Sequence, residues 1–199
     1  MRVLPALITI AMRRARPGTG SSVAFLQRRT AMLFVPDLRF LPVPWVLVGG
    51  LAIRAYAPER MTQDVDILIA AEDEAAARSA FESARYGMLG DLSIGGFTVE
   101  PQNGPSIDVL VSNAPWVTVA LKHPSRDVAG YPVIPRPYLI LMKLESGRSI
   151  DMGDLSRLLG SASPAERAES RTIVEQYRPD VLEDYDSLVI LADLEFGSP

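Results

Sequence analysis

The chain has 199 residues, of which 48% are hydrophobic and 22% charged, and its formal net charge is −4. This length indicates one domain, or one domain with a small helical appendage, and enough apolar residues for a buried core. The absence of cysteine excludes disulfides, thiolate nucleophiles and Cys-ligated zinc, and His123, interpreted as a loop residue, is the only histidine. A net negative charge gives no global basis for nucleic-acid binding, so any chemistry is expected to rest on carboxylates.

The first 22 residues are interpreted as a dispensable, weakly ordered extension. Their apolar run, Val3 to Met12, is too short to span a membrane, and the arginines follow it instead of preceding it as in a signal peptide. Pro17 to Ser22 resembles a flexible linker and lacks the Gly-Lys-Ser/Thr of a phosphate-binding P-loop. We therefore expect a cytoplasmic protein without a membrane partner.

Strand-like and helix-like segments alternate through the first two thirds of the chain. The strands are rich in apolar and β-branched residues, and the helices show amphipathic spacing or alanine enrichment. We predict helices over 23–34, 51–56 and 72–86, the last with Gly87 as its C-cap, and strands over 45–48, 65–70 and 106–112. A strand pair is expected within 91–100, and weaker strands over 115–121 and 131–134.

From Pro137 onward the chain is predicted to be helical. The expected helices are 138–146, 149–159, one that begins with a capping box at Ser163 and Glu166, and an acidic helix from Pro179 to about 194 with a solvated face. A mixed front and a helical back indicate an α+β protein, with a short mixed sheet and flanking helices in residues 23–135 and a C-terminal helical segment in 136–199.

One stretch, Trp45 to Ile69, combines two features of a phosphate-transfer site. Gly49 and Gly50 lie between a strand and a short helix, where bare backbone and free N–H groups can approach an anion. Asp64 and Asp66 open the next strand two residues apart, so both carboxylates are expected on one face. Aspartate oxygens suit Mg²⁺. Arg54, on the short helix, is expected to be solvated.

This stretch resembles the signature of the DNA polymerase beta-like nucleotidyltransferases, which is an apolar strand, Gly-Gly or Gly-Ser, a spacer and then Asp-x-Asp. Thirteen residues separate Gly50 from Asp64, within the usual range for that family. The segments G-G-L-A and R-M-T-Q-D-V-D-I are most similar to the small bacterial abortive-infection (AbiEii-type) nucleotidyltransferases. The resemblance covers roughly residues 40 to 160 and implies a nucleotidyltransferase fold.

The resemblance implies Mg²⁺-dependent transfer of a nucleoside monophosphate from an NTP to a hydroxyl or phosphate acceptor, with two metal ions. Asp64 and Asp66 would bind metal, Gly49 and Gly50 would hold phosphates, and Arg60 and Thr62 would flank the site. A third carboxylate is expected on a neighbouring strand. Asp108 stands inside the apolar run I-D-V-L-V, where an aspartate is costly unless it is paired or bound to metal. Asp108 could also act as, or orient, a general base.

A second resembling segment lies in the helical part of the chain. Lys143 would contact the triphosphate or its pyrophosphate product, and Arg148, Asp151 and Asp154 follow as in related toxins. Asp151 and Asp154 are three residues apart and would share a helical face. Ile150 stands where related sequences often have a basic residue. The alternative for Lys143 is a surface lysine that forms salt bridges with its neighbours.

The acceptor stays open from the sequence. The resemblance implies tRNA, a protein side chain or a small molecule, and a possible toxin–antitoxin or phage-defence setting with a cognate partner protein. A member of this fold that binds nucleotide or a protein partner without turnover is the alternative. The retention of all three carboxylates argues against that alternative.

Overall fold

The computed structural model describes residues 35–57 and 64–197. The chain divides into two compact units, Met1–Pro36 and Asp37–Pro199, and the second holds nearly all of the described residues. The predicted extension over 1–22, the helix over 23–34, and Arg60 and Thr62 lie outside the described residues.

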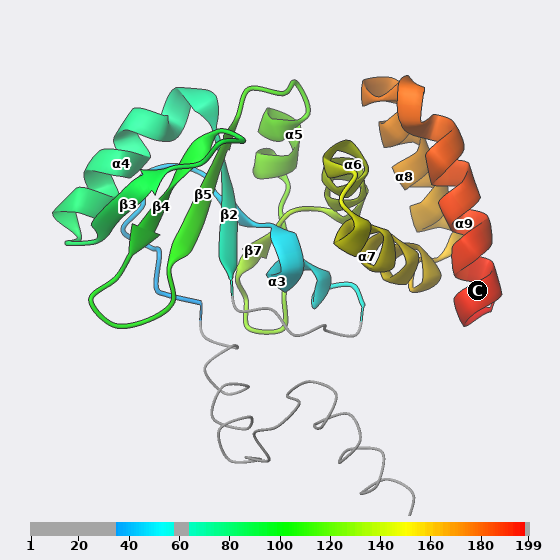
Figure 1. Cartoon of the computed structure of the whole chain (residues 1–199), viewed down its shortest axis with the longest axis horizontal. Helices are drawn as coiled ribbons and strands as arrows, with labels where there is room; N and C mark the ends of the chain where they lie inside the picture. The colour runs from blue at the N-terminus through cyan, green and yellow to red at the C-terminus, as the bar shows by residue number, and fades with distance from the viewer. Residues whose placement is uncertain (1–34, 58–63, 198–199) are drawn as a thin grey trace, which may run out of the picture. The chain divides into compact units, whose positions relative to one another are not determined.

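The described residues build one mixed sheet, which makes the protein α+β as expected (Figure 1). The strand order is β3-β4-β5-β2-β1-β7-β6. Their bounds are β1 Val46–Leu47, β2 Val65–Ala70, β3 Gly87–Asp91, β4 Gly96–Glu100, β5 Ile107–Ser112, β6 Ser125–Arg126 and β7 Pro132–Val133. The central pair, β2 and β5, is parallel, whereas β1 joins β2 and β4 joins β5 in antiparallel fashion. These central strands confirm the predicted strands over 65–70 and 106–112 within one residue.

The two faces of the sheet differ in chemistry because side chains alternate along each strand. Ile67 and Val109 are paired across β2 and β5 and are fully buried. Phe97 of β4 lies on the same face. Its ring packs edge-to-face against the ring of Phe81 on helix α4 (Glu74–Ser83), with the ring centroids 6.1 Å apart. Helix α4 therefore covers the apolar face, and the residues that alternate with these, Asp66 among them, lie on the other face.

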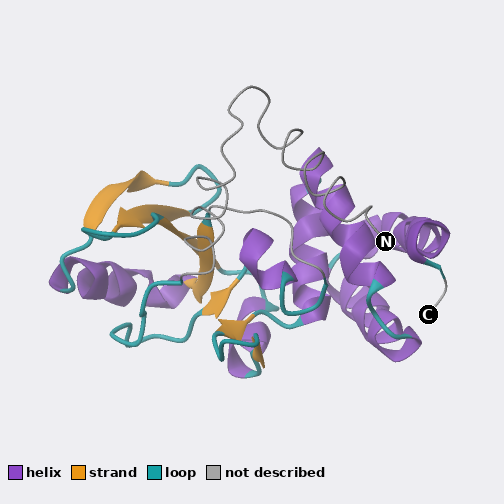
Figure 2. Ribbon diagram, turned by 90° about the horizontal axis from the view of Figure 1, so that it is seen from below, coloured by secondary structure: helices purple, strands orange, loops and turns teal. Residues whose placement is uncertain are grey.

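Helices predominate in the second half of the chain: one lies between β5 and β6, and the others form the C-terminal segment to one side of the strands (Figure 2). They are α5 Val117–Lys122, α6 Arg136–Ser146, α7 Ser149–Gly160, α8 Pro164–Tyr177 and α9 Leu182–Phe196, with a 3₁₀ turn over Pro179–Val181 before α9. The predicted capping box is present: the side chain of Ser163 accepts from the N–H of Glu166, whose carboxylate accepts from the N–H of Ser163. Trp116 stacks on Tyr138 of α6 with centroids 5.9 Å apart and links the two parts of this unit.

Two predicted elements were wrong. The helix α5, Val117–Lys122, replaces the strand predicted over 115–121, because Val117, Ala120 and Leu121 are buried at helical spacing. Gly87 is not a C-cap, since α4 ends at Ser83 and Arg85 takes the left-handed conformation with φ 63°. Gly87 instead begins β3, opposite Glu100.

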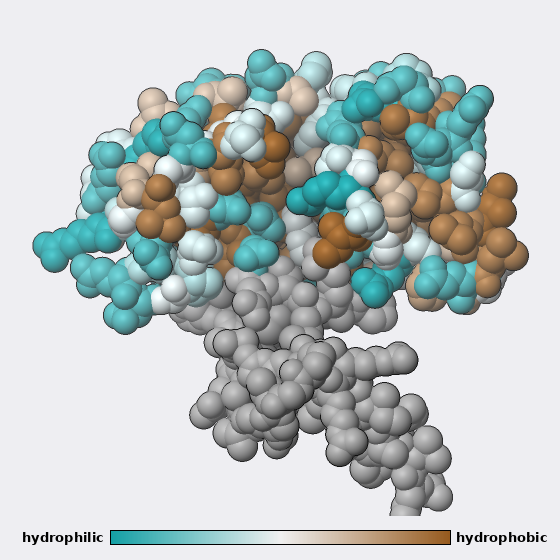
Figure 3. Space-filling view, viewed as in Figure 1, coloured by the Kyte–Doolittle hydropathy of each residue, from teal (hydrophilic) through white to brown (hydrophobic). Residues whose placement is uncertain are grey.

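The acidic helix α9 matches its prediction as a solvated acidic face only in part. Glu183 and Asp184 are exposed, but other acidic residues are paired. Asp186 and Asp193 form ion pairs with Arg171 and Arg167 of α8, and Glu195 accepts a hydrogen bond from Ser156. The exposed side of α9 carries apolar side chains, and Figure 3 shows a hydrophobic patch over its C-terminal end. The exposed members are Ile190, Leu191, Leu194 and Phe196. None of the helices in the described part is long and apolar enough to cross a membrane.

Candidate active site

Asp66 and Asp108 stand side by side on the two central strands. They are directly opposite one another in the parallel register of β2 and β5, and both are half-buried. The hydroxyl of Thr98 on β4, which faces Asp108 in the antiparallel register, donates to Asp108 Oδ1 at 2.7 Å. Two carboxylates from segments 42 positions apart in the chain are thus neighbours on one face.

The carboxylate of Asp66 is poorly compensated. None of the described residues donates a hydrogen bond to it. Burial, and then the like charges of Asp108 and Asp64, raises the pKa of Asp66 to about 6. The positive charges of Arg148 and Lys143 oppose this rise in pKa but do not cancel it. A partly buried anion with like charges beside it is the environment that a bound cation would relieve.

Gly49 is required to be glycine by the position of Asp66. Helix α3 (Gly49–Ile53) begins directly after β1, and Gly49 has a left-handed φ of 60°. A Cβ at this position would lie 2.0 Å from Asp66 Oδ2. The N–H of Val48 donates to the carbonyl of Asp66 at 3.0 Å. The glycine therefore lets the backbone lie directly against the carboxylate, and Gly50 behind it is buried.

Of the other residues predicted in this region, the structure describes Asp64 and Arg54 but not Arg60 and Thr62. Asp64 is exposed just before β2, and its charge acts on Asp66. Arg60 and Thr62 lie outside the described residues, so their predicted roles stay predictions. Arg54 is not solvated as expected: it forms a buried ion pair with Asp127 at 2.5 Å, which fixes α3 to the turn between β6 and β7.

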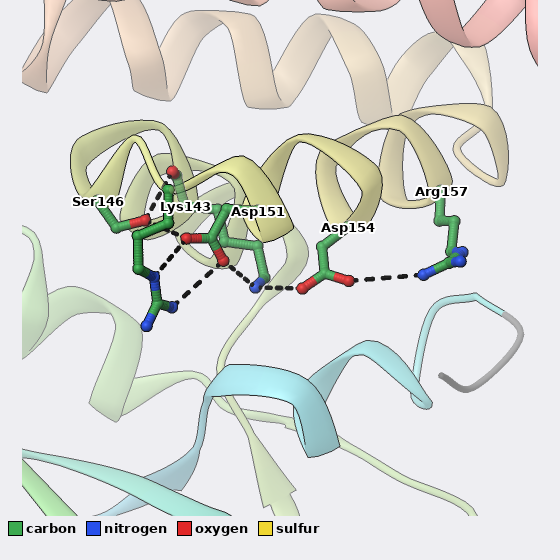
Figure 4. A network of polar contacts seen from close by, with 6 residues as sticks. Lys143, Ser146, Asp151, Asp154 and Arg157 are labelled. Atoms are coloured by element: carbon green, nitrogen blue, oxygen red, sulfur yellow. Dashed lines mark hydrogen bonds and ion pairs between the residues drawn. The ribbon is translucent and has the colours of Figure 1, made fainter. Parts of the chain in front are cut away.

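Lys143 forms a buried ion network with both aspartates predicted to share a helical face (Figure 4). Lys143 Nζ lies 2.9 Å from Asp151 Oδ1 and 2.8 Å from Asp154 Oδ2. The Lys143 side chain is 5% exposed and both aspartates are fully buried. The salt-bridged lysine of the alternative interpretation is present, but it is buried between α6 and α7 and not on the surface.

The carboxylate of Asp151 accepts several hydrogen bonds within this network. Burial favours its neutral form, but hydrogen bonds from Arg148, Ser146 and Lys143 outweigh that effect. The pKa of Asp151 is therefore held well below its usual range. Arg148 Nε donates to Asp151 Oδ2 at 2.8 Å, while 66% of the Arg148 side chain stays exposed. The helical segment thus presents a fixed, exposed guanidinium, and its charge reaches Asp66.

One contributor, Thr98, was missed by the sequence analysis. Its residue type and its place in an alternating strand carry no sign of function, and its role depends on the register between β4 and β5. Only the position of its hydroxyl beside Asp108 indicates a role, and the sequence does not specify that position.

The carboxylates fit a divalent cation by their chemistry and by the raised pKa of Asp66. Mg²⁺ is commonly held by one or two carboxylates together with substrate phosphates and water. Asp66 and Asp108 provide such a pair. Within residues 35–57 and 64–197, no group of three or more His, Cys, Asp or Glu side chains is gathered closely enough to hold a metal ion. The participation of Asp64 as a third ligand therefore stays a prediction.

Comparisons with known proteins give only distant structural likenesses. No protein-family model matches the chain, and no curated protein matches it. The chain is similar to a solution structure of the antibiotic-resistance factor ANT(2'')-Ia, with 15% identity, coverage of 88% of this chain and 95% of that chain, and a TM-score of 0.42. A crystal structure of ANT(2'')-Ia with adenylyl-2''-tobramycin gives 17% identity, coverage of 87% and 99%, and a TM-score of 0.42.

A third structure is the lincomycin-bound lincosamide antibiotic adenylyltransferase LnuA. It gives 14% identity, coverage of 58% of this chain and 85% of that chain, and a TM-score of 0.42. Likenesses of this degree do not assign an activity to the chain.

Proposed function

We propose that this protein is a nucleotidyltransferase, which moves a nucleoside monophosphate from an NTP to an acceptor. The observation that carries the proposal is the pair Asp66 and Asp108, in register on adjacent parallel strands and backed by the bare backbone of Gly49. Arg148 supplies an exposed positive charge from the helical segment on the side of Asp66. Adjacent carboxylates and a nearby cation suit a metal-bound phosphate substrate.

Asp66 and Asp108 would hold Mg²⁺, and Asp64 is proposed as a further ligand. When bound, the metal would neutralise charge on the phosphate oxygens and help to orient the triphosphate. Binding a cation would also keep Asp66 ionised, because its pKa of about 6 reflects burial and the like charges beside it. Gly49 and Gly50 are proposed to let the phosphates approach the backbone at the start of α3.

The proposed nucleotidyl transfer needs one group that accepts the proton of the attacking hydroxyl. An acceptor hydroxyl oxygen attacks the α-phosphorus, the new O–P bond forms, and the bond from that phosphorus to the bridging oxygen breaks, so that pyrophosphate leaves. Asp108, whose Oδ1 is fixed by Thr98 at 2.7 Å, is proposed to take the proton from the attacking hydroxyl. Holding the hydroxyl and the phosphate together supplies the orientation that such a transfer needs.

The acceptor is proposed to be tRNA, a protein side chain or a small molecule. The resemblance to AbiEii-type proteins motivates a toxin–antitoxin or phage-defence role, with a cognate protein partner. An NTP labelled with tritium in the nucleoside or with radioactive phosphorus at the α-position is offered with total RNA, with protein and with a small-molecule pool. The fraction that carries the label distinguishes these acceptors.

Calorimetry tests the site before the acceptor is known. ATP, GTP, CTP and UTP, each with Mg²⁺, are titrated into the full chain, into Asp64→Ala/Asp66→Ala and into Asp184→Ala, an exposed aspartate on α9. We expect at least one NTP to bind the wild type and the Asp184→Ala control, and to bind the double variant at least about 10-fold more weakly. Mg²⁺-dependent binding that is equal in all three proteins would contradict the proposed site.

Turnover separates an enzyme from a binding protein of the same fold. Once a labelled acceptor is found, Asp108→Asn is expected to lower the rate by at least about 100-fold, in the range for loss of a general base. Nucleotide binding without transfer to any acceptor class would favour the non-catalytic alternative.

A further inference from the structure

Among the described residues, the ion network between α6 and α7 joins three cations to two carboxylates. Lys143 contacts both Asp151 and Asp154, Arg148 contacts Asp151, and Arg157 lies 3.6 Å from Asp154 Oδ1. The described members of the network thus carry three positive and two negative charges. Lys143 and both aspartates are buried, so the charge of the lysine is not accessible from the surface.

The exposed ends of the network are its two arginines. Figure 4 shows Lys143 between the two aspartates, with Arg157 on the far side of Asp154 from Lys143. The side chains of Arg148 and Arg157 are 66% and 40% exposed, compared with 5% for Lys143. A substrate anion would therefore meet an arginine more readily than the lysine.

Arg148 is the arginine that is fixed and electrostatically linked to the carboxylate site. Its Nε and Nη2 donate to Asp151 at 2.8 Å and 3.3 Å, whereas no described residue accepts from its Nη1. Its charge and that of Asp66 act on one another. A guanidinium held on one edge keeps its other edge free for two parallel hydrogen bonds to a phosphate.

Resting on the proposed function, we propose that Arg148 binds the terminal phosphates of the donor NTP, and that Lys143 positions Arg148 through Asp151 without contacting the nucleotide itself. This assignment differs from the role that the sequence resemblance implies for Lys143. The α-phosphate must lie at Asp66 and Asp108, where the bond breaks, so the guanidinium on the helical segment takes the part of the triphosphate that leaves as pyrophosphate.

Calorimetry with inorganic triphosphate, with each NTP and with each NMP, all with Mg²⁺, tests this assignment. Arg148→Gln is expected to weaken binding of the triphosphate and of the NTP by about 10- to 100-fold, the range for a lost charge-assisted hydrogen bond, and to leave NMP binding unchanged. Arg148→Lys, which keeps the charge but not the fork, should retain more affinity than Arg148→Gln.

Two matched controls separate phosphate binding from network stability. Arg157→Gln removes the other exposed arginine of the same network. Arg171→Gln removes an arginine of α8 that donates to Asp186 through Nε and Nη2, as Arg148 donates to Asp151. Both are expected to bind NTP as the wild type does. Urea denaturation of each variant shows whether any loss of affinity follows a loss of folded protein.

The outcomes distinguish this inference from the function on which it rests. If no NTP binds the wild type, the proposed function fails. If NTP binds the wild type and Arg148→Gln equally well, or if Arg148→Gln and Arg157→Gln weaken binding equally, only the assignment of Arg148 is overturned. An equal loss of NTP and NMP affinity in Arg148→Gln would overturn it too, because a contact to terminal phosphates cannot affect an NMP.

Discussion

Asp151, which is fully buried, and Asp66, which is half-buried, have opposite electrostatic environments. Asp151, between α6 and α7, accepts hydrogen bonds from Arg148, Ser146 and Lys143, and its pKa is held well below its usual range. Asp66, on β2, receives no hydrogen bond from the described residues, and burial with nearby carboxylates raises its pKa to about 6. The charge of Asp151 is thus compensated within the fold, whereas the charge of Asp66 is left for a ligand to compensate.

The difference shows which charges serve the fold and which are left for a ligand. A buried ion pair that is fully hydrogen-bonded keeps its partners in one arrangement. A carboxylate that stays unpaired costs stability, and such groups are concentrated at binding and catalytic sites. Removing a charge should therefore destabilise the helical network and stabilise the strand site, and the predictions below test that contrast.

The largest effect is expected from Lys143→Met. This change leaves two fully buried aspartates without their shared cation, and breaking a buried ion pair costs about 3–5 kcal/mol of unfolding free energy. Urea denaturation at neutral pH measures the loss. Lys122→Met, at an exposed lysine that ends α5, is the matched control. A loss no greater than in this control would mean that the network does not stabilise the fold.

Gly49→Ala is expected to lower the free energy of unfolding by about 2–4 kcal/mol. The alanine must adopt a left-handed φ, and its Cβ would lie 2.0 Å from Asp66 Oδ2. Gly153→Ala is the comparison, because Gly153 lies inside α7 and an added Cβ there meets nothing within 4 Å. That control should gain about 0.5–1 kcal/mol. Equal stability of the two variants would contradict the close approach of Gly49 to Asp66.

Asp66→Asn is expected to raise the free energy of unfolding by about 1–3 kcal/mol at pH 7 without metal, since each unit of raised pKa represents about 1.4 kcal/mol. The same substitution at Asp151 should lower it, because that carboxylate is stabilised in its charged form. Denaturation of both variants in a chelator measures the two signs. A loss of stability in Asp66→Asn would show that its carboxylate is compensated after all.

The smallest expected effect is the dependence of stability on pH. The pKa of Asp66 is about 6 in the folded protein, against an ordinary value of 3.8 for an aspartate. The folded state therefore holds more protons between these values. The contribution of Asp66 to stability is complete below the lower pKa and is lost as pH rises through the higher one, at no more than about 1.4 kcal/mol per pH unit.

The difference between Asp66→Asn and the wild type isolates this contribution from those of other carboxylates. Measured in a chelator, the advantage of the variant should grow from about pH 4 to pH 7. Asp151 has a lowered pKa, so its contribution is retained across this window and lost only at more acidic pH. An advantage that does not change with pH would contradict the raised pKa of Asp66.

The sequence by itself determined the elements that depend on local patterning. The runs of apolar and β-branched residues around Asp66 and Asp108 predicted β2 and β5, and Ser163 with Glu166 predicted the start of α8. These signals are local, because side-chain periodicity and capping act within a few residues. The spacing of Asp151 and Asp154 likewise predicted their common face, since residues three apart are neighbours on a helix.

Only the tertiary structure decided which charges are paired. Arg54 reaches Asp127 across 73 positions of sequence, and the hydroxyl of Thr98 reaches Asp108 through strand register. Whether Lys143 is exposed or buried depends on how α7 packs against α6. The sequence determines the residue type and its charge. Burial and the choice of partner are properties of packing, and they set the pKa of each group and whether it is free to bind a ligand.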